Sequence, residues 1–253
     1  MNNSVLSLQG VAKSFGKSQI IRNVTMDVAP GERIAVIGPN GAGKSTLFNL
    51  ISGRLQPTSG DIVLNGTSLL KLPPYEIYRK GLSRSFQITN IFQRLSVYEN
   101  IRCSVLWSLG YRYSLFRFLD SLRDVRRRAE QMMERVGLQA RRDVEAGLLT
   151  YAEQRSLEIA MTVAGNPHVV LLDEPTAGMS RSESAAAIEL IRSLTQGRTL
   201  LMVEHDMSVV FGLADRVAVL AGGSLIAFDT PARIQEDAAV KEAYLGDVHV
   251  DGH

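Results

Sequence analysis

Short segments in which apolar and polar residues alternate dominate both ends of the chain. Between residues 4 and 28, turn signals at Gly10 and Gly16 separate these segments, which predict two or three antiparallel strands. They lead into the apolar run Arg33–Ile37, which predicts a further strand. Near the other end, alternation on either side of Gly222-Gly223 predicts a hairpin, and Pro231 then opens a helix.

Two longer apolar runs have no alternation. His168–Leu172 and Thr199–Val203 carry apolar residues at successive positions, which is typical of strands buried on both faces of a parallel sheet. The first run ends in Asp173-Glu174 and the second in Glu204-His205-Asp206. The chain is therefore predicted to have an α/β fold with a parallel-sheet core and an antiparallel β-subdomain.

Helices are predicted by their start signals. Ser96 with Glu99, and Thr150 with Glu153, have the spacing of a capping box. The first pair opens a mainly helical region that reaches Val136, and the second opens a helix that reaches Ala164. An alanine-rich helix is expected over residues 180–196, stopped by Gly197.

The segment Tyr111–Leu119, within the first helical region, mixes aromatic residues with arginines. Such a mixture can contact a membrane interface or a partner helix. It can equally form a surface helix whose apolar side packs on the rest of the domain. The sequence leaves both interpretations open.

The stretch Gly38–Thr46 matches the phosphate-binding pattern GxxxxGK[ST], with the predicted strand before it and the helical run Leu47–Ile51 after it. Its glycines allow successive N–H groups to turn toward phosphate oxygens, and the helix start adds unpaired N–H groups. The predicted nucleotide-binding residues are Gly38, Pro39, Asn40, Gly41, Ala42, Gly43, Lys44, Ser45 and Thr46.

Three of these side chains have separate expected roles. Lys44 would reach the β- and γ-phosphates, Ser45 would place its hydroxyl on Mg²⁺, and Thr46 would donate to a nearer phosphate. The loop therefore predicts a nucleotide bound together with a magnesium ion.

The charged residues that follow the two apolar runs add candidate chemistry. Asp173, at a strand tip, can hold Mg²⁺ directly or through water, and Glu174 beside it can polarise an attacking water. His205 can meet a γ-phosphate, or it can be a loop histidine without a role.

Three further residues are weaker candidates when each is taken alone. Phe15 is either an aromatic plate for a purine ring or a core residue. Gln87 follows a predicted strand over residues 82–86, where a loop could carry it toward the nucleotide, or it is a surface glutamine. Thr150 either helps the start of its helix to receive an anion or simply caps that helix.

Composition bounds these interpretations. With 253 residues, 45% of them hydrophobic and 21% charged, the chain is an ordinary globular protein. A net charge of +2 gives no support to a dominant nucleic-acid-binding role. The single cysteine, Cys103, excludes an internal disulfide and is expected to be a small buried residue. Neither a signal peptide nor a bilayer-length apolar run is found, so a cytoplasmic protein is expected.

In their order along the chain, these motifs resemble the ATP-binding cassette ATPases from Leu6 to about Gly246. The matching positions are Phe15, the phosphate loop at Gly38–Thr46, Gln87, the signature at Leu149–Gln154, the pair Asp173-Glu174, and His205. The similarity is strongest to the subfamily that powers branched-chain amino acid import. It lies in Gly81–Gln87, Glu153–Ala160, Val203–Met207 and Ala243–Gly246.

The resemblance implies a P-loop fold forming one ATPase domain over residues 1–246, with a helical lobe inserted at about 88–164 and a tail at 247–253. Two such subunits, identical or paralogous, would sandwich two ATP molecules with Mg²⁺. Each site would join one chain's phosphate loop to the signature of the other chain, here Thr150, Tyr151, Ala152 and Glu153.

The resemblance also implies individual roles. Glu174 would orient and deprotonate water, His205 would position the γ-phosphate, and Lys44 would offset developing charge. Gln87 would sense Mg²⁺ and report to a membrane subunit, while Ser45 and Asp173 would hold the metal.

The implied function is to power an importer of branched-chain amino acids or of related small polar or organic-acid solutes. The implied partners are permease subunits and, indirectly, a solute-binding protein, with no nucleic acid, at the cytoplasmic face of the membrane. The alternatives are an ATPase that energises export or non-transport assembly, and a slow ATP-binding switch.

Two positions depart from the family pattern. Ala152 replaces a glycine that the signature usually retains, and its extra methyl group could weaken closure of the dimer. Ser180 stands where many members carry aspartate or asparagine, which puts a usual contact across the dimer in doubt.

Overall fold

The computed structural model describes residues 4–85, 91–108 and 122–245. The predicted Gln87, the whole segment Tyr111–Leu119 and the predicted tail at 247–253 lie outside these described residues.

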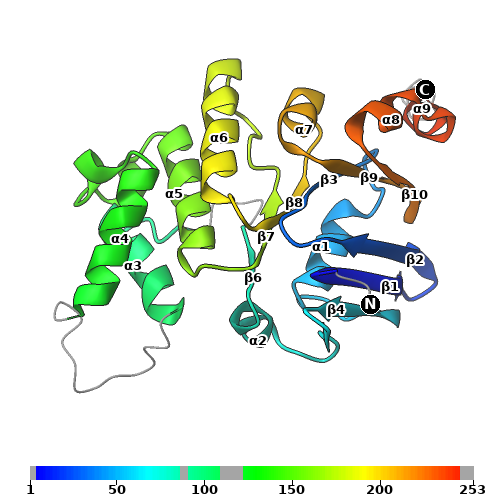
Figure 1. The fold of residues 1–253 in the computed structure, drawn as a ribbon, viewed down its shortest axis with the longest axis horizontal. Coiled ribbons are helices and arrows are strands. Elements are labelled where there is room, and N and C mark those ends of the chain that lie inside the picture. Colours follow the sequence, from blue (N-terminus) through cyan, green and yellow to red (C-terminus); the bar gives the residue numbers. More distant parts are fainter. Residues whose placement is uncertain (1–3, 86–90, 109–121, 246–253) are drawn as a thin grey trace.

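A four-stranded antiparallel sheet lies at one end of the molecule (Figure 1), with strand order β2-β1-β4-β5. The long strands β1 and β2 form a hairpin, which confirms the alternation predicted for residues 4–28. The strands are β1 (Leu6–Phe15), β2 (Ser18–Val28), β4 (Ser59–Leu64) and β5 (Thr67–Ser68).

A six-stranded sheet forms the centre, with strand order β10-β9-β3-β8-β7-β6. All its pairs are parallel except the hairpin of β9 and β10. The strands are β3 (Arg33–Ile37), β6 (Leu82–Arg84), β7 (Val169–Asp173), β8 (Thr199–Val203), β9 (Arg216–Ala221) and β10 (Ser224–Asp229).

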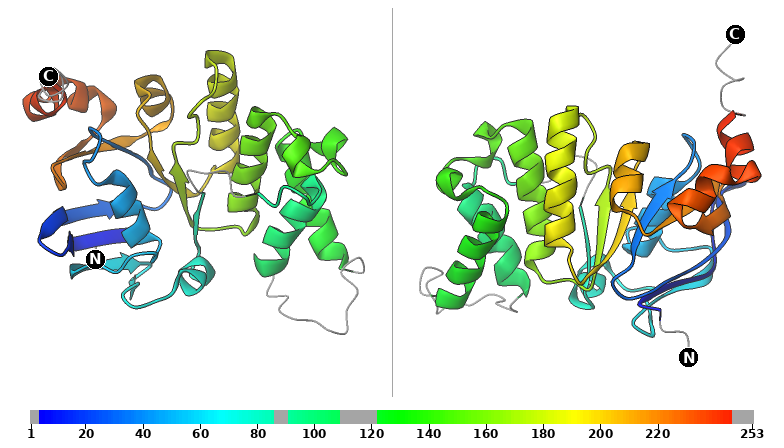
Figure 2. Two further views of the ribbon diagram at one scale, coloured as in Figure 1. Left: turned by 180° about the vertical axis from the view of Figure 1, so that it is seen from behind. Right: turned by 45° about the horizontal axis from the view of Figure 1, so that its top comes forward.

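Helices cover both faces of the central sheet. In Figure 1, α3, α4 and α5 form a lobe at the end opposite the antiparallel sheet. Figure 2 shows α5, α6 and α7 in a row along one face, with α8 and α9 beyond them. The helices are α1 (Lys44–Ile51), α2 (Pro74–Arg79), α3 (Val97–Ser108), α4 (Arg123–Arg135), α5 (Tyr151–Ala164), α6 (Arg181–Leu194), α7 (Met207–Leu213), α8 (Pro231–Glu236) and α9 (Ala238–Leu245), with 3₁₀ turns at Gln139–Arg141 and Ala146–Leu148.

The continuous apolar runs are explained by two hydrophobic cores, one on each face of the sheet. In β3, Ala35 and Ile37 belong to the core under the helical row, whereas Ile34 and Val36 face α1 and the antiparallel sheet. Successive strand residues point to opposite faces, so a strand covered on both sides needs apolar residues at every position. The prediction of a parallel-sheet core is thereby confirmed.

Two details differ from expectation. Helix α6 ends at Leu194, earlier than predicted, because the Thr195 hydroxyl bonds back to the Ile191 carbonyl and Gly197 (φ 72°) turns the chain. The prediction that Cys103 is buried is wrong, since its side chain is exposed. Ile101 and Val105 share the buried face of α3, and Cys103 lies on the other face.

Among the residues that the structure describes, no helix has both the length and the apolar character needed to cross a bilayer.

Candidate functional site

The phosphate loop, Asp173-Glu174 and His205 come together at one edge of the central sheet, whereas the predicted signature residues lie in the helical lobe at the start of α5. Strands β3, β8 and β7 are neighbours, and Val36, Val203 and Asp173 stand at one level in the register. The phosphate loop follows β3, Glu204-His205 follow β8, and Glu174 follows β7. In open α/β sheets, ligands bind in the crevice at the carboxyl ends of such strands.

Glycines let the phosphate loop fit against its neighbours. A Cβ on Gly38 would lie 2.0 Å from the Leu220 carbonyl oxygen of β9. A Cβ on Gly43 (φ 99°) would lie 2.7 Å from Ile21 of β2. The loop is therefore wedged between the two sheets, which fixes the N–H groups that it presents.

The polar side chains of the loop stand at the start of α1. Lys44 Nζ donates to the carbonyl oxygens of Gly38 (2.5 Å) and Pro39 (2.9 Å), so its ammonium group lies across the loop. Ser45 is exposed and Thr46 is half-buried. These positions suit groups that bind the phosphates of a nucleotide.

Arg84 connects this helix to the acidic strand end. Its guanidinium donates to Asn49 Oδ1 of α1 (2.8 Å) and to Ser52 Oγ just after that helix (2.9 Å), and it pairs with Asp173 Oδ2 at 2.9 Å. Burial lowers the pKa of Arg84 from its ordinary value, although the Asp173 carboxylate opposes this shift. Ser45 lies one helical turn before Asn49, on the face of α1 that Arg84 links to Asp173.

Glu174 has an unusual backbone. Its φ of 46° lies in the left-handed region, which costs a residue other than glycine about 1–2 kcal/mol. Its N–H donates to the Val203 carbonyl oxygen at 3.0 Å, and its side chain is half-buried.

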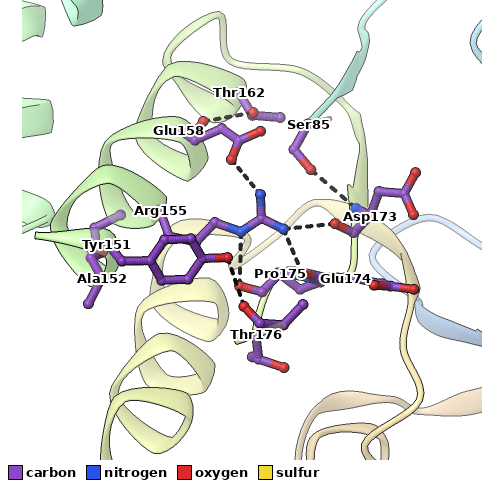
Figure 3. A network of polar contacts seen from close by, with 12 residues as sticks. Ser85, Tyr151, Ala152, Arg155, Glu158, Thr162, Asp173, Glu174, Pro175 and Thr176 are labelled. Atoms are coloured by element: carbon purple, nitrogen blue, oxygen red, sulfur yellow. Dashed lines mark hydrogen bonds and ion pairs between the residues drawn. The ribbon is translucent and has the colours of Figure 1, made fainter. Parts of the chain in front are cut away.

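Arg155, on α5, is bound to the backbone on both sides of Glu174, as Figure 3 shows. Its Nε donates to the Pro175 carbonyl oxygen (3.1 Å), and its Nη2 donates to those of Asp173 (2.8 Å) and Glu174 (2.6 Å). Glu158 Oε2 accepts from Nη1 at 2.5 Å and offsets the buried charge.

A buried carboxylate joins the loop after Pro175 to the segment that follows β8 and carries His205. Glu204 Oε1 accepts hydrogen bonds from the N–H (3.2 Å) and the hydroxyl (2.8 Å) of Thr176, and Oε2 accepts one from the His205 N–H (3.3 Å). Burial raises the pKa of Glu204, although these hydrogen bonds oppose the shift. His205 itself is exposed.

The predicted signature forms the start of α5. Thr150 and Glu153 make a reciprocal capping box, as predicted. Glu153 Oε2 accepts from the Thr150 N–H at 2.9 Å, and Arg141 Nε donates to Oε1 at 3.1 Å. These contacts lower the pKa of Glu153, with the backbone bond from Thr150 as the main cause. The glutamate at this position thus has a structural use.

Tyr151 and Ala152 occupy the first turn of α5. The Tyr151 hydroxyl donates to the Ala177 carbonyl oxygen at 2.8 Å, which ties the signature to the loop after Thr176 in the same chain (Figure 3). The Ala152 carbonyl oxygen accepts from Ser156 Oγ at 3.0 Å. The side chain of Tyr151 is 48% exposed.

Phe15 lies at the tip of the β1–β2 hairpin, opposite Ser18. The same hairpin contacts the phosphate loop at Gly43, through Ile20 and Ile21. The Phe15 ring is 49% exposed, with Lys13 Nζ at 5.1 Å from its centroid. The exposed ring at the hairpin tip is available for stacking, and Phe15 is not a core residue.

The roles of three charged residues, Arg84, Arg155 and Glu158, were not predicted from the sequence. The available signal was weak: two charges three residues apart in an otherwise apolar part of α5, and an arginine inside a predicted strand. Their partners lie far along the chain, at separations of up to 89 residues, so spacing alone could not reveal them.

Comparison with protein families gives two matches. Residues 21–177 match the ABC transporter family, and residues 224–250 match the branched-chain amino acid ATP-binding cassette transporter family.

Individual relatives cover nearly the whole chain. The chain is 37% identical over 256 residues to the high-affinity branched-chain amino acid transport ATP-binding protein LivG of Escherichia coli (strain K12), covering 98% of this chain and 100% of the relative. It is 33% identical to the lipopolysaccharide export system ATP-binding protein LptB of Acidithiobacillus ferridurans, covering 96% and 97%. Its fold matches a crystal structure of an ATP-binding cassette of an ABC transporter in its ADP conformation, with a TM-score of 0.84 and 27% identity, covering 96% and 99%.

Proposed function

Because this chain belongs to the ABC transporter family and is one of its ATPases, we propose that it powers an importer. We propose branched-chain amino acids or related small polar or organic-acid solutes as the cargo. Support comes from the family match over residues 224–250 and from the identity to LivG.

The observation that carries the proposal is the meeting of three elements at one sheet edge: the phosphate loop, Asp173-Glu174, and His205. Glu174 orients the attacking water and takes its proton. His205 positions the γ-phosphate, and Lys44 offsets the charge that develops on it. Phe15 stacks on the adenine ring.

Magnesium fits the oxygen donors at this edge. The Ser45 hydroxyl, at the start of α1, and the Asp173 carboxylate, which Arg84 links to the same helix, are hard oxygen ligands, and Mg²⁺ in nucleotide sites takes few protein ligands beside the phosphates. When bound, it would neutralise charge on the phosphate oxygens. Gln87 would complete this set as a sensor of the metal.

The second half of each site comes from another subunit, identical or paralogous. Thr150, Tyr151, Ala152 and Glu153 of the partner's signature would approach the γ-phosphate. ATP then contacts both chains only when the dimer is closed, and this differential binding drives the cycle.

A permease segment would dock at the cytoplasmic face of the membrane, in a cleft of about 440 Å³ between α2, β6, α3 and α5. Ile77, Phe92 and Cys103 line it together with Arg84 and Ser85, which directly precede the segment that carries Gln87. Gln87, two residues after Ser85 in the sequence, would then report the metal to the permease, and the permease would couple to a solute-binding protein.

Uptake by the reconstituted complex tests the importer proposal. The chain is combined with its permease subunits in vesicles, ATP and Mg²⁺ are supplied on the ATPase side, and uptake of labelled branched-chain amino acids is measured. We expect ATP-dependent uptake that requires the solute-binding protein and is lost in Glu174→Gln.

The alternative is an ATPase that energises export or assembly, which the identity to LptB favours. ATP hydrolysis that is stimulated by the permease and accompanied by outward transport would select this alternative over import.

A further inference from the structure

The strained backbone at Glu174 must be held by its surroundings. Glu174 is the residue that follows the buried strand β7, and its φ of 46° sends the chain away from the strand direction. The orientation of the two flanking peptide groups therefore decides where the carboxylate points. Contacts that hold those two peptide groups in place therefore also set the position of the Glu174 carboxylate, which is the proposed base.

Arg155 is the side chain that holds these peptide groups. Three successive carbonyl oxygens, from Asp173, Glu174 and Pro175, accept hydrogen bonds of 2.6–3.1 Å from one guanidinium (Figure 3). The residue is only 2% exposed, so water does not compete for these carbonyl groups. Glu158, one turn further along α5, anchors the remaining Nη1.

We propose that Arg155 is a positioning residue for ATP hydrolysis: it holds the backbone around Glu174 so that the carboxylate faces the attacking water. This inference rests on the role proposed above for Glu174. Arg155 lies two residues after the signature residues Thr150–Glu153, so the helix proposed to reach the partner's ATP also orients the base of its own chain.

The guanidinium is chemically suited to this task. It is planar and carries five N–H donors in a rigid fork, whereas a lysine ammonium is a single point with three donors on a flexible stem. A lysine at position 155 keeps the positive charge beside Glu158 but cannot hold three carbonyl oxygens in one plane. Arg155→Lys therefore separates charge from geometry.

The test is a double-mutant cycle in turnover. Rates of ATP hydrolysis with Mg²⁺ are measured for the wild type, Arg155→Lys, Glu174→Gln and the double variant, under single-turnover conditions for the slow proteins. Arg155→Lys should lower kcat about ten- to a hundred-fold while KM changes by less than about threefold. On the Glu174→Gln background, the same substitution should change the residual rate by less than about threefold.

A purely structural role would give a different pattern. If Arg155→Lys lowers the rate by the same factor in both backgrounds, or leaves kcat unchanged, the positioning role is wrong. If Glu174→Gln hydrolyses ATP at the wild-type rate, Glu174 is not the base, and both proposals fail. The two failures are thus distinguishable.

Two further variants serve as a control and as a replacement for Arg155→Lys. Arg198→Lys is the matched control, because Arg198 also donates from its guanidinium to a backbone carbonyl, that of Leu194, at a site remote from Glu174. It should leave kcat unchanged. If Arg155→Lys does not fold, as judged by circular dichroism and thermal unfolding, Glu158→Gln replaces it and should lower kcat only when Glu174 is present.

Discussion

At the scale of single residues, the buried Glu204 carboxylate is hydrogen-bonded to two loops, one that contains Thr176 and one that contains His205. It is 1% exposed and accepts hydrogen bonds from Thr176 and His205. Burial penalises its charged form, so its pKa is raised above the ordinary value of 4.5, against the pull of those hydrogen bonds. The folded protein therefore binds this proton more tightly than the unfolded chain does.

This difference sets the sign of a pH effect on stability. As pH rises from 4.5 through the raised pKa of Glu204, the unfolded chain loses the proton first, and the contribution of Glu204 to the free energy of unfolding falls. Glu204→Gln removes this titration.

Urea unfolding of both proteins at several pH values between 4.5 and 8 measures the effect. The free energy of unfolding of the wild type minus that of the variant should decrease as pH rises, because the other titrations cancel in the difference. A difference that stays constant or increases with pH would contradict the assigned shift.

At the scale of elements, hydrogen-bonded caps stabilise the starts of three helices. Helices α3, α5 and α6 each begin with a serine or threonine whose hydroxyl accepts from the backbone N–H of a glutamate three residues later. Ser180 is the cap of α6, which gives a structural reason for serine at a position where many relatives of the family carry aspartate or asparagine. All three residue types are good caps.

Ser180→Ala should lower the free energy of unfolding by about 1 kcal/mol, because it removes the hydroxyl that satisfies the Glu183 N–H. Ser180→Asp should stay close to the wild type, since aspartate caps equally well. Denaturant unfolding of the wild type and the two variants measures these free energies. Equal decreases in the free energy of unfolding of both variants would show that capping is not the role of Ser180.

Elements with strong local signals were predictable from the sequence. The strand Thr199–Val203 has the predicted bounds, because a continuous apolar run ends at a charged residue on one side and follows a glycine turn on the other. The phosphate loop and the capping box of α5 were equally local. The end of α6 was not predictable in this way, because it involves a hydrogen bond from the Thr195 hydroxyl to the Ile191 carbonyl oxygen, and residue spacing does not predict that bond.

Contacts between distant segments were not predictable. Arg155 donates to carbonyl oxygens about twenty residues away along the chain. Every residue has a backbone carbonyl group, so residue identity does not show which of them will accept a hydrogen bond. Cys103 was misjudged because its exposure depends on which face of α3 packs inward.

At the scale of the whole molecule, the signature and the phosphate loop belong to different parts of the fold. The helical lobe carries the start of α5, while α1 packs between the two sheets (Figure 1). Beside the start of α5, Leu148 is 76% exposed and Tyr151 is 48% exposed. Exposed apolar side chains beside a proposed interface are expected to be covered by the partner chain.

Leu148→Glu should therefore weaken the ATP-dependent dimer by about tenfold or more, because a carboxylate would be buried at the interface. Light scattering of the ATP-bound Glu174→Gln protein, with and without this substitution, measures the effect. Leu70→Glu is the control, since Leu70 is also exposed but follows β5 in the antiparallel sheet. Equal dimerisation of the two variants would remove Leu148 from the interface.

The most direct test of the account is phosphate release by the purified chain and by Glu174→Gln, at saturating ATP and Mg²⁺, with bound ATP measured in the same samples. We expect equal ATP binding within about threefold and a rate at least about a hundred-fold lower in the variant, the usual contribution of a general base. Equal rates in the two proteins would contradict the assignment of hydrolysis to Glu174.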